Sequence, residues 1–197
     1  MPLYIQRKDT AATLLDSDGD SGHGLIVDAS GKLWTVAAFG ASEDHIGSIS
    51  GEAAIKTVVL SLHTDANVVN DVLAATQVVS EALRVDDGTG VIQSIVVQDD
   101  DDNAGDLDLI FFDANTSVGS ESAICSMADN DTILGVVEVV ESDYVDMINS
   151  QVASFKNVGI VIQGATGTDD IYMAAIARDT DTYTASGITI RLGILQD

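Results

Sequence analysis

Two short acidic segments hold the residues of this 197-residue chain that are most capable of chemistry. The first, DSDGDSGHG at residues 16–24, places Asp16, Asp18 and Asp20 at alternate positions, and the second, within VVQDDDDNAGDLDLIFFD, places four aspartates at 99–102. Calcium needs six to eight converging oxygen ligands, which a helix-loop-helix site supplies from alternating acids, a glycine at position six and a glutamate at position twelve. Both segments are therefore candidates for a cation site.

Neither segment fits that calcium pattern. In the first, the glycines stand at 19 and 22, and Val27 occupies position twelve. In the second, successive side chains of an extended segment diverge, and no glutamate follows at the required distance. We therefore predict that both are solvated loops whose charge discourages pairing of strand edges with other chains. The sequence predicts no metal site and no cofactor.

The other reactive side chains form no recognisable catalytic group. His23, His45 and His63 are isolated, so the H-x-H and H-E-x-x-H spacings of metal centres are missing. Cys125, in AICSMAD, lies among apolar and small residues, which indicates a buried small hydrophobe. Carboxylate pairs in GDLDL and DTDTY are expected by chance in a chain with 26 aspartates. The sequence therefore predicts that the protein is not an enzyme.

The charge of the chain restricts its partners. It has 32 acidic and 8 basic residues, for a net charge of -24. Such a field repels phosphate backbones and anionic lipid surfaces, so we expect neither nucleic acid nor a membrane as a direct partner. The sequence has no apolar run of membrane-spanning length, and the N-terminus MPLYIQRKDT lacks the apolar core of a signal peptide.

From about residue 51 the sequence is typical of short strands. Of the acids, 26 are Asp and only 6 are Glu, and Asp favours turns over helices. The segments bounded by turn residues are AIKTVVLSLH, VIQSIVVQ, LDLIFFD, TILGVVEVV, FKNVGIVIQ, DIYMAAIAR and GITIRLGILQ. Strands at this spacing without long helical intervals predict an all-β fold, an antiparallel β-sandwich or jelly roll, over residues 51–197.

Three of these segments carry finer expectations. In AIKTVVLSLH, the candidates to face a core are Ile55, Val59 and Leu60. Strict alternation in VIQSIVVQ would put Ile92, Ser94, Val96 and Gln98 on one face and Val91, Gln93, Ile95 and Val97 on the other. VNDVLAATQVVSEALRV could line a helix with Leu73, Val78, Val79 and Leu83, but its β-branched content favours an extended segment.

Residues 1–50 have a different character, being polar and spaced by glycines. Their one amphipathic pair, LIVDASGKLWTV, places apolar runs on both sides of Asp28-Ala29-Ser30-Gly31, which predicts a β-hairpin. A hairpin of this size does not fold alone. We therefore predict an N-terminal extended arm with a short hairpin over residues 1–50, docking on the main domain or on a partner.

Several segments together resemble a family of tailed-bacteriophage virion proteins, the capsid decoration or cement proteins built on a jelly roll. The resemblance runs in order from Val58 to Asp197 through LAATQVVSEALRVDDGTGVIQSIVVQDDDD, DLDLIFFDANTSVGSESAICSMADND, ILGVVEVVESDYVD, VGIVIQ and YTASGITIRLGILQD. GLIVDASGKLWTV is also similar to a segment near the start of various phage structural proteins. The chain departs from the family in its heavier acidity and in its first twenty-odd residues.

The resemblance implies a structural virion protein on the exterior of the capsid. It would be a homotrimer that clamps neighbouring copies of the major capsid protein, with the arm reaching onto the shell. The arm residues expected to contact the capsid are Tyr4, Ile5, Leu25, Ile26, Leu33 and Trp34. An alternative keeps the fold but makes the chain a tail or fibre-associated module that binds host glycans, with calcium as a candidate requirement. A hydrolase is a third option, which no defined acid–base pair supports.

Overall fold

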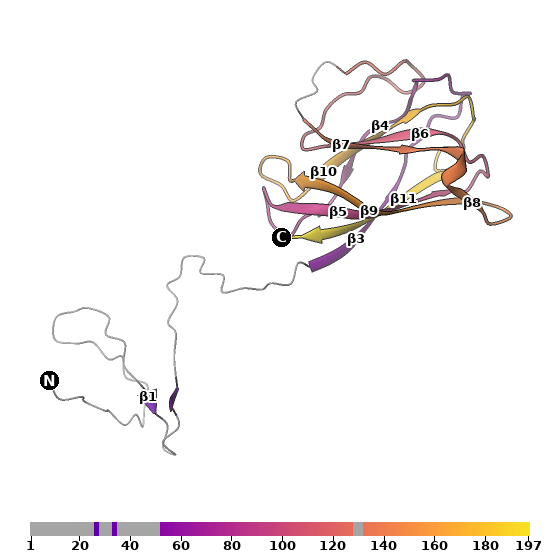
Figure 1. Ribbon diagram of the computed structural model, residues 1–197. Coiled ribbons are helices and arrows are strands. Elements are labelled where there is room, and N and C mark those ends of the chain that lie inside the picture. Colours follow the sequence, from indigo (N-terminus) through magenta and orange to yellow (C-terminus); the bar gives the residue numbers. More distant parts are fainter. Residues whose placement is uncertain (1–25, 28–32, 35–51, 128–131) are drawn as a thin grey trace. The chain divides into compact units, whose positions relative to one another are not determined.

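The structure is a computed structural model that describes residues 26–27, 33–34, 52–127 and 132–197. The chain divides into two units, Met1–Ser48 and Ile49–Asp197, and each is described by itself (Figure 1). In the first unit, β1 (Ile26–Val27) pairs antiparallel with β2 (Leu33–Trp34), which places Ile26 opposite Trp34. This is the strand pairing of the predicted hairpin, whose turn at residues 28–32 lies outside the described residues.

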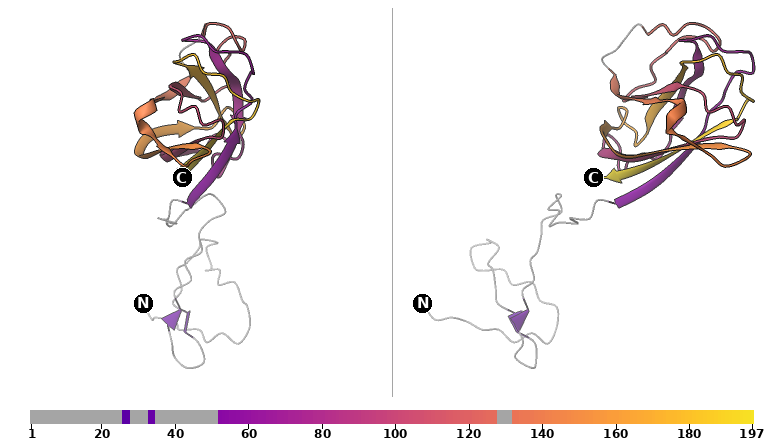
Figure 2. Two further views of the ribbon diagram at one scale, coloured as in Figure 1. Left: turned by 90° about the vertical axis from the view of Figure 1, so that its right-hand side faces the viewer. Right: turned by 45° about the vertical axis from the view of Figure 1, so that its right-hand side comes forward.

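The second unit consists of two antiparallel sheets packed face to face (Figures 1 and 2). The five-stranded sheet has the order β3 (Glu52–Val59), β11 (Ile188–Gln196), β5 (Thr89–Asp99), β9 (Gln151–Gln163) and β8 (Tyr144–Asp146). The four-stranded sheet has the order β4 (Val72–Val79), β10 (Ile171–Ala177), β6 (Leu107–Phe112) and β7 (Ile133–Val139). A single 3-10 turn, η1 (Glu141–Asp143), leads into β8.

The connectivity is that of a jelly roll. If the eight longer strands are counted one to eight along the chain, the two sheets have the orders 1-8-3-6 and 2-7-4-5, and β8 is an added short edge strand. Nearly all sequential strands therefore change sheets, as in a pair of interlocked Greek keys. The predicted antiparallel sandwich is confirmed, and β4 shows that the ambiguous segment 69–85 is extended where it forms regular structure.

The main core lies between the sheets and draws on both. Among its fully buried side chains are Phe111 of β6, Met173 of β10, Ile95 of β5 and Leu192 of β11. These belong to strands whose alternate residues point inward, so each sheet buries one face and closes a single apolar layer.

The prediction that three residues in and after β3 face the core was wrong for two of them. Leu60 is buried, but Ile55 and Val59 are 77% and 52% exposed. The register with β11 instead turns Val58 and Lys56 toward the sandwich, opposite Ile190 and Leu192. An inward lysine is tolerated because β3 is an edge strand, where the long stem packs along the sheet and the charged end reaches Glu81 at 3.6 Å.

Strict alternation along β5 was also a wrong prediction. The pairing of β5 with β9 shifts between Ile92 and Ser94, and the opposite segment of β9 contains Asn157 and Gly159, both with positive φ. This bulge reverses the alternation, so Ile92 shares the buried face with Ile95 rather than with Ser94.

Four cross-strand rows and one further residue on the outward side of the five-stranded sheet form a patch that we call the outer face. Across β3, β11, β5 and β9 the rows read Ala53–Leu195–Val91–Val161, Ile55–Gly193–Ser94–Lys156, Thr57–Arg191–Val96–Ser154 and Val59–Thr189–Gln98–Val152, and Val145 of β8 extends the last row.

The outward side of the four-stranded sheet is covered by the segment 113–127. Val118 of that segment is buried with Phe112, Ile110 and Ile176 of the strands, and Cys125 packs against the same group. The sandwich therefore has a second, smaller core outside the four-stranded sheet. Cys125 is a half-buried apolar contact here, and burial raises the pKa of its thiol.

Candidate functional site: the acidic end of the sandwich

The four-aspartate run begins at the last residue of β5, where Asp99 is fully buried. Its carboxylate accepts backbone N–H groups from Asp101, Asn103 and Ala104, each at 2.9 Å. Such bonds satisfy amides that the turn leaves without partners, and they let Asp102 and Ala104 adopt positive φ. Asp99 is therefore the internal anchor of the turn that follows β5.

The next aspartates tie this turn to neighbouring parts of the sandwich. Asp101 accepts the backbone N–H of Thr184 at 2.7 Å and its hydroxyl at 3.0 Å, while the backbone N–H of Asp100 donates to Gly187 at 2.8 Å. Asp102 accepts the side-chain amide of Gln151 at 2.8 Å. The run thus holds the segment before β11 and the start of β9.

The prediction of a solvated loop holds only in part for this run. Asp100 and Asp102 are exposed, but Asp101 is half-buried and Asp99 is fully buried. In the described parts of the chain, no group of three or more His, Cys, Asp or Glu side chains is arranged to hold a metal ion. The carboxylates serve instead as hydrogen-bond acceptors for backbone donors.

A second set of acids surrounds this turn. The backbone N–H of Asp106 donates to the carboxylate of Asp179, and Asp106 in turn accepts the backbone N–H of Glu141 at 2.6 Å. The backbone N–H of Asp181 donates to Asp179 at 3.2 Å. These contacts join three segments at one end of the sandwich, two of which contribute carboxylates.

Burial and mutual repulsion change the titration of this cluster. Burial, followed by the negative charge of Asp179, raises the pKa of Asp181 to about 6. Burial also raises the pKa of Asp99, and this effect outweighs its three backbone hydrogen bonds. The pKa values of the Tyr183 and Tyr144 hydroxyls are raised by burial and by the same carboxylates. The surroundings therefore favour the protonated state of Asp99 and of Asp181.

Raised carboxyl pKa values can indicate general acid catalysis, so the surroundings matter. His63, the one histidine within the described residues, is half-buried, and neither of its ring nitrogens has a hydrogen-bond partner. The residues of the acidic cluster named above include no cysteine, lysine or histidine, and the carboxylates of Asp99, Asp106 and Asp179 accept backbone N–H groups. The geometry supports a structural role for the cluster in joining loops.

Asp181 should make the stability of the protein depend on pH. Its folded-state pKa of about 6 lies above the ordinary aspartate value of 3.8, so the native state binds the proton more readily than the unfolded state. Stability should therefore fall as pH rises from about 4 to 6. We expect Asp181→Asn to raise Tm at pH 7 by about 2–4 °C, the change that about 1 kcal/mol produces in a domain of this size.

The pH dependence of the Asp181 variant is the critical measurement. Its advantage over the wild type should shrink as the pH is lowered from 7 toward 4, when the wild-type carboxyl becomes protonated. Asp65→Asn, which removes one charge from an exposed loop position, is the matched control. Thermal unfolding followed by circular dichroism gives both quantities. If the two variants had equal effects on Tm at all pH values, Asp181 would affect stability only through the net charge of the protein.

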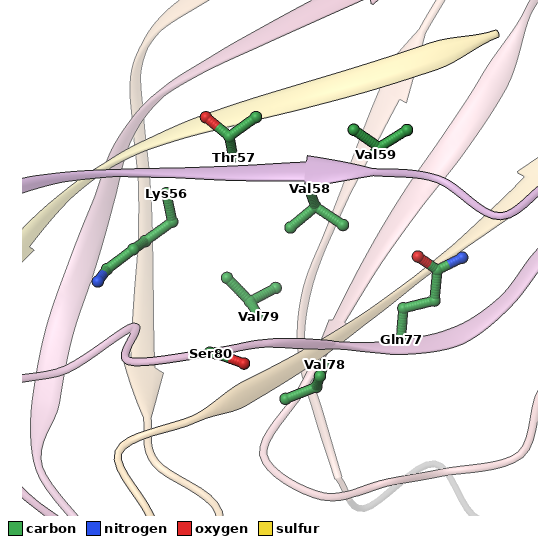
Figure 3. Close-up of a pocket in the computed structure, with 8 residues that line it drawn as sticks. All are labelled: Lys56, Thr57, Val58, Val59, Gln77, Val78, Val79 and Ser80. Atoms are coloured by element: carbon green, nitrogen blue, oxygen red, sulfur yellow. The ribbon is translucent and has the colours of Figure 1, made fainter. Parts of the chain in front are cut away.

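A groove lies between two edge strands, β3 and β4. It has a volume of about 350 Å³, and its lining comes from β3 and from β4 with the residue that follows it. Val58 and Val79 point toward one another across it, whereas Thr57 and Val59 project from the opposite side of β3 (Figure 3). None of its eight lining residues is aromatic, so the groove lacks the stacking surface that sugars favour.

The predicted capsid-contact residues all belong to the first unit. Ile26, Leu33 and Trp34 lie in the β1–β2 pair, which brings Ile26 opposite Trp34. Tyr4, Ile5 and Leu25 lie outside the described residues, as do the acidic segment 16–24 and two of the histidines, His23 and His45. The arm assignment stays a prediction.

The comparisons with known proteins add no relative. No protein-family model, no curated protein and no solved structure matches the chain. No helix of the described residues is long and apolar enough to span a membrane. The class that the structure defines is an acidic jelly-roll sandwich with a separate N-terminal unit.

Proposed function

We propose that this chain is a structural virion protein that decorates the outside of a tailed-bacteriophage head. It would bind as a homotrimer to the major capsid protein and stabilise the contacts between neighbouring capsid subunits. Its role would be non-enzymatic. The jelly roll is an architecture that viral capsid proteins share with lectins and cupins, so the fold supports this function without specifying it.

The observation that carries the proposal is the division of the chain into an arm-sized unit and a self-sufficient sandwich. Within the described residues, the two hydrophobic cores are formed by side chains between Val58 and Ile194. The second unit thus forms both cores from its own described strands and loops, and the described part of the first unit is a strand pair with two residues on each side. Such a segment is suited to gain its stability from a partner surface.

Multivalency explains how modest contacts could hold a shell together. Once one arm of a trimer is bound, the other two bind at high effective concentration, so three weak interfaces act as one strong one. The acidic surface of the chain is suited to the exterior of the head or to a basic patch on the shell, and it is unsuited to contact with packaged DNA.

Removal of residues 1–50 is expected to abolish binding to undecorated heads while leaving a cooperatively folded sandwich. Co-sedimentation with heads measures the first property, and thermal unfolding measures the second. In the full-length chain, Leu33→Ala/Trp34→Ala should weaken head binding by at least about tenfold, since buried aromatic anchors dominate such interfaces.

The matched control for the arm variant is Val85→Ala/Val68→Ala, which truncates two exposed valines of the sandwich. It should bind heads as the wild type does. A truncated protein that still decorated heads at full occupancy would refute the arm assignment. Full-length protein that ignored heads would refute the decoration function, and glycan-array binding would then become the measurement for the tail-module alternative.

A further inference from the structure

The outer face of the five-stranded sheet carries no acidic side chain. Its 17 residues, four in each of four rows plus Val145, include no Asp or Glu, whereas the whole chain has 32. Two of the chain's 8 basic residues, Lys156 and Arg191, do lie on this face. In a protein of net charge -24, this is a surface on which negative charge is locally absent.

The same face exposes large apolar side chains. Ile55 is 77% exposed, Val161 is 66% exposed and Leu195 is 41% exposed. Leu195 stands between Ala53 and Val91 in a row that ends at Val161, so an apolar stripe crosses four strands. Apolar surface with few charges is the composition found at the centre of protein interfaces.

The low strand propensity of aspartate does not account for this composition. On the outward side of the four-stranded sheet, Asp108 of β6 lies directly opposite Glu138 of β7. That side is also partly covered by segment 113–127, which buries Val118 against Phe112. Of the two outward sides of the sandwich, the side with the outer face is thus the one that the described part of the chain leaves uncovered.

We propose that the outer face binds a second copy of this chain. Two copies of net charge -24 repel each other, so they can associate only where each surface lacks negative charge. A basic capsid surface would instead be met by acidic residues, because complementary potentials favour such contacts. The outer face therefore lets two copies meet through the same acid-free surface, where Lys156 and Arg191 lower the local negative potential.

The size and polar border of the face fit this assignment. A standard interface involves roughly 20–30 residues on each side, and the 17 residues of the rows form the centre of such a patch. At one border Arg191 donates to Gln98 at 3.0 Å, and Gln98 donates to Asp100 at 2.7 Å. Acids are thus met beyond the ends of the rows, at Asp100 after β5 and at Asp197 after β11, whose backbone N–H donates to Thr89 at 3.1 Å, as expected for a polar rim. That the assembly contains three copies and not two rests on the proposed function.

The test uses the full-length protein and sedimentation velocity over a concentration series. Arg191→Glu, in the middle of the face, and Val161→Glu, on the apolar stripe, should each raise the dissociation constant of self-association at least about tenfold. Association of the wild type should strengthen from about 0.1 to 1 M salt, because the Debye length falls from about 10 to 3 Å and screens the repulsion.

Each variant has a control that makes the same substitution elsewhere. Arg84→Glu changes an exposed arginine that lies 3.6 Å from the carboxylate of Glu52, and Val136→Glu changes a valine that is 52% exposed on β7. Both controls should self-associate within about twofold of the wild type, since isolated surface changes have small effects. Thermal unfolding of all four variants verifies that they are folded.

The outcomes separate this inference from the proposed function. Wild-type protein that is monomeric at every salt concentration, or face variants that associate as the controls do, would overturn the inference. Face variants that remain oligomeric but no longer bind heads would assign the face to the capsid and would also overturn it. Self-association through the face by a protein that ignores heads would support the inference and refute the decoration function.

Discussion

Asp99→Ala is expected to lower the free energy of unfolding by about 3–5 kcal/mol, one of the two largest effects that we predict. The substitution leaves the amides of Asp101, Asn103 and Ala104 without their acceptor inside a turn that is held at positive φ. It therefore loosens the turn in which Asp100 and Asp101 contact the segment before β11. Urea unfolding of the full-length protein measures the loss.

Two neighbouring substitutions serve as controls for Asp99. Asp99→Asn keeps a carbonyl oxygen that can accept part of these bonds, so its loss should be smaller. Asp100→Ala removes an exposed carboxylate from the same run and should change stability by less than about 0.5 kcal/mol. If Asp100→Ala cost as much as Asp99→Ala, the stabilisation would come from the loop sequence in general and not from the buried anchor.

The effect of pH on the Asp99 variant tests the role of burial. Burial raises the pKa of this carboxyl in the folded state, so the native state gains a proton at higher pH than the unfolded state does. Acidification therefore stabilises the wild type relative to Asp99→Ala. The difference between them should be at least as large at pH 5 as at pH 7. A difference that disappeared on acidification would show that hydrogen bonding to the ionised form outweighs burial.

Phe112→Ala and Phe111→Ala are each expected to cost about 3–5 kcal/mol, the usual loss for truncating a buried phenylalanine. The two residues are adjacent in β6 and both are fully buried, but they face opposite sides of the four-stranded sheet. Phe111 fills the main core, whereas Phe112 lies beneath segment 113–127. The same substitution should therefore have different structural consequences at the two positions.

Cys125 reports on this difference because it is the only cysteine of the chain and packs in the smaller core. Phe112→Ala should speed the reaction of its thiol with a disulfide reagent under native conditions, since segment 113–127 loses its main contact. Phe111→Ala should speed the reaction only near the unfolding transition. Equal acceleration by both variants would mean that the two cores open together, as one cooperative unit.

The strands could be predicted from local sequence because turn residues interrupt apolar segments at short and regular intervals. GITIRLGILQ and LDLIFFD became β11 and β6, and the β-branched content of segment 69–85 favoured the extended form that β4 adopts. The all-β class and the strand pair around residues 28–32 follow from the same local signals. These features depend only on residues that are close together in the chain, so a single sequence is enough to predict them.

The acidic run shows the limit of that reasoning. The run of aspartates marks the end of the sandwich at which the candidate site lies. The sequence does not show which of the four aspartates is buried. Burial separates them, because β5 ends at Asp99 and places this side chain between the sheets, while Asp100 projects outside. Asp179 and Asp181 join the cluster from a segment that is distant in the chain, which no local pattern reveals.

The direction in which each strand faces was settled by the packing of the sheets. Both sides of β3 carry apolar residues, so local pattern alone could not say whether Ile55 or Val58 is buried, and pairing with β11 decided for Val58. A bulge opposite Ser94 reversed the alternation of β5 in the same way. The outer face arises from these two choices. Its existence depends on the register between strands that are distant in the chain. The strands themselves can be predicted from the amino-acid sequence. The sequence also determines the strong negative charge, which is the reason that a surface without acids is informative.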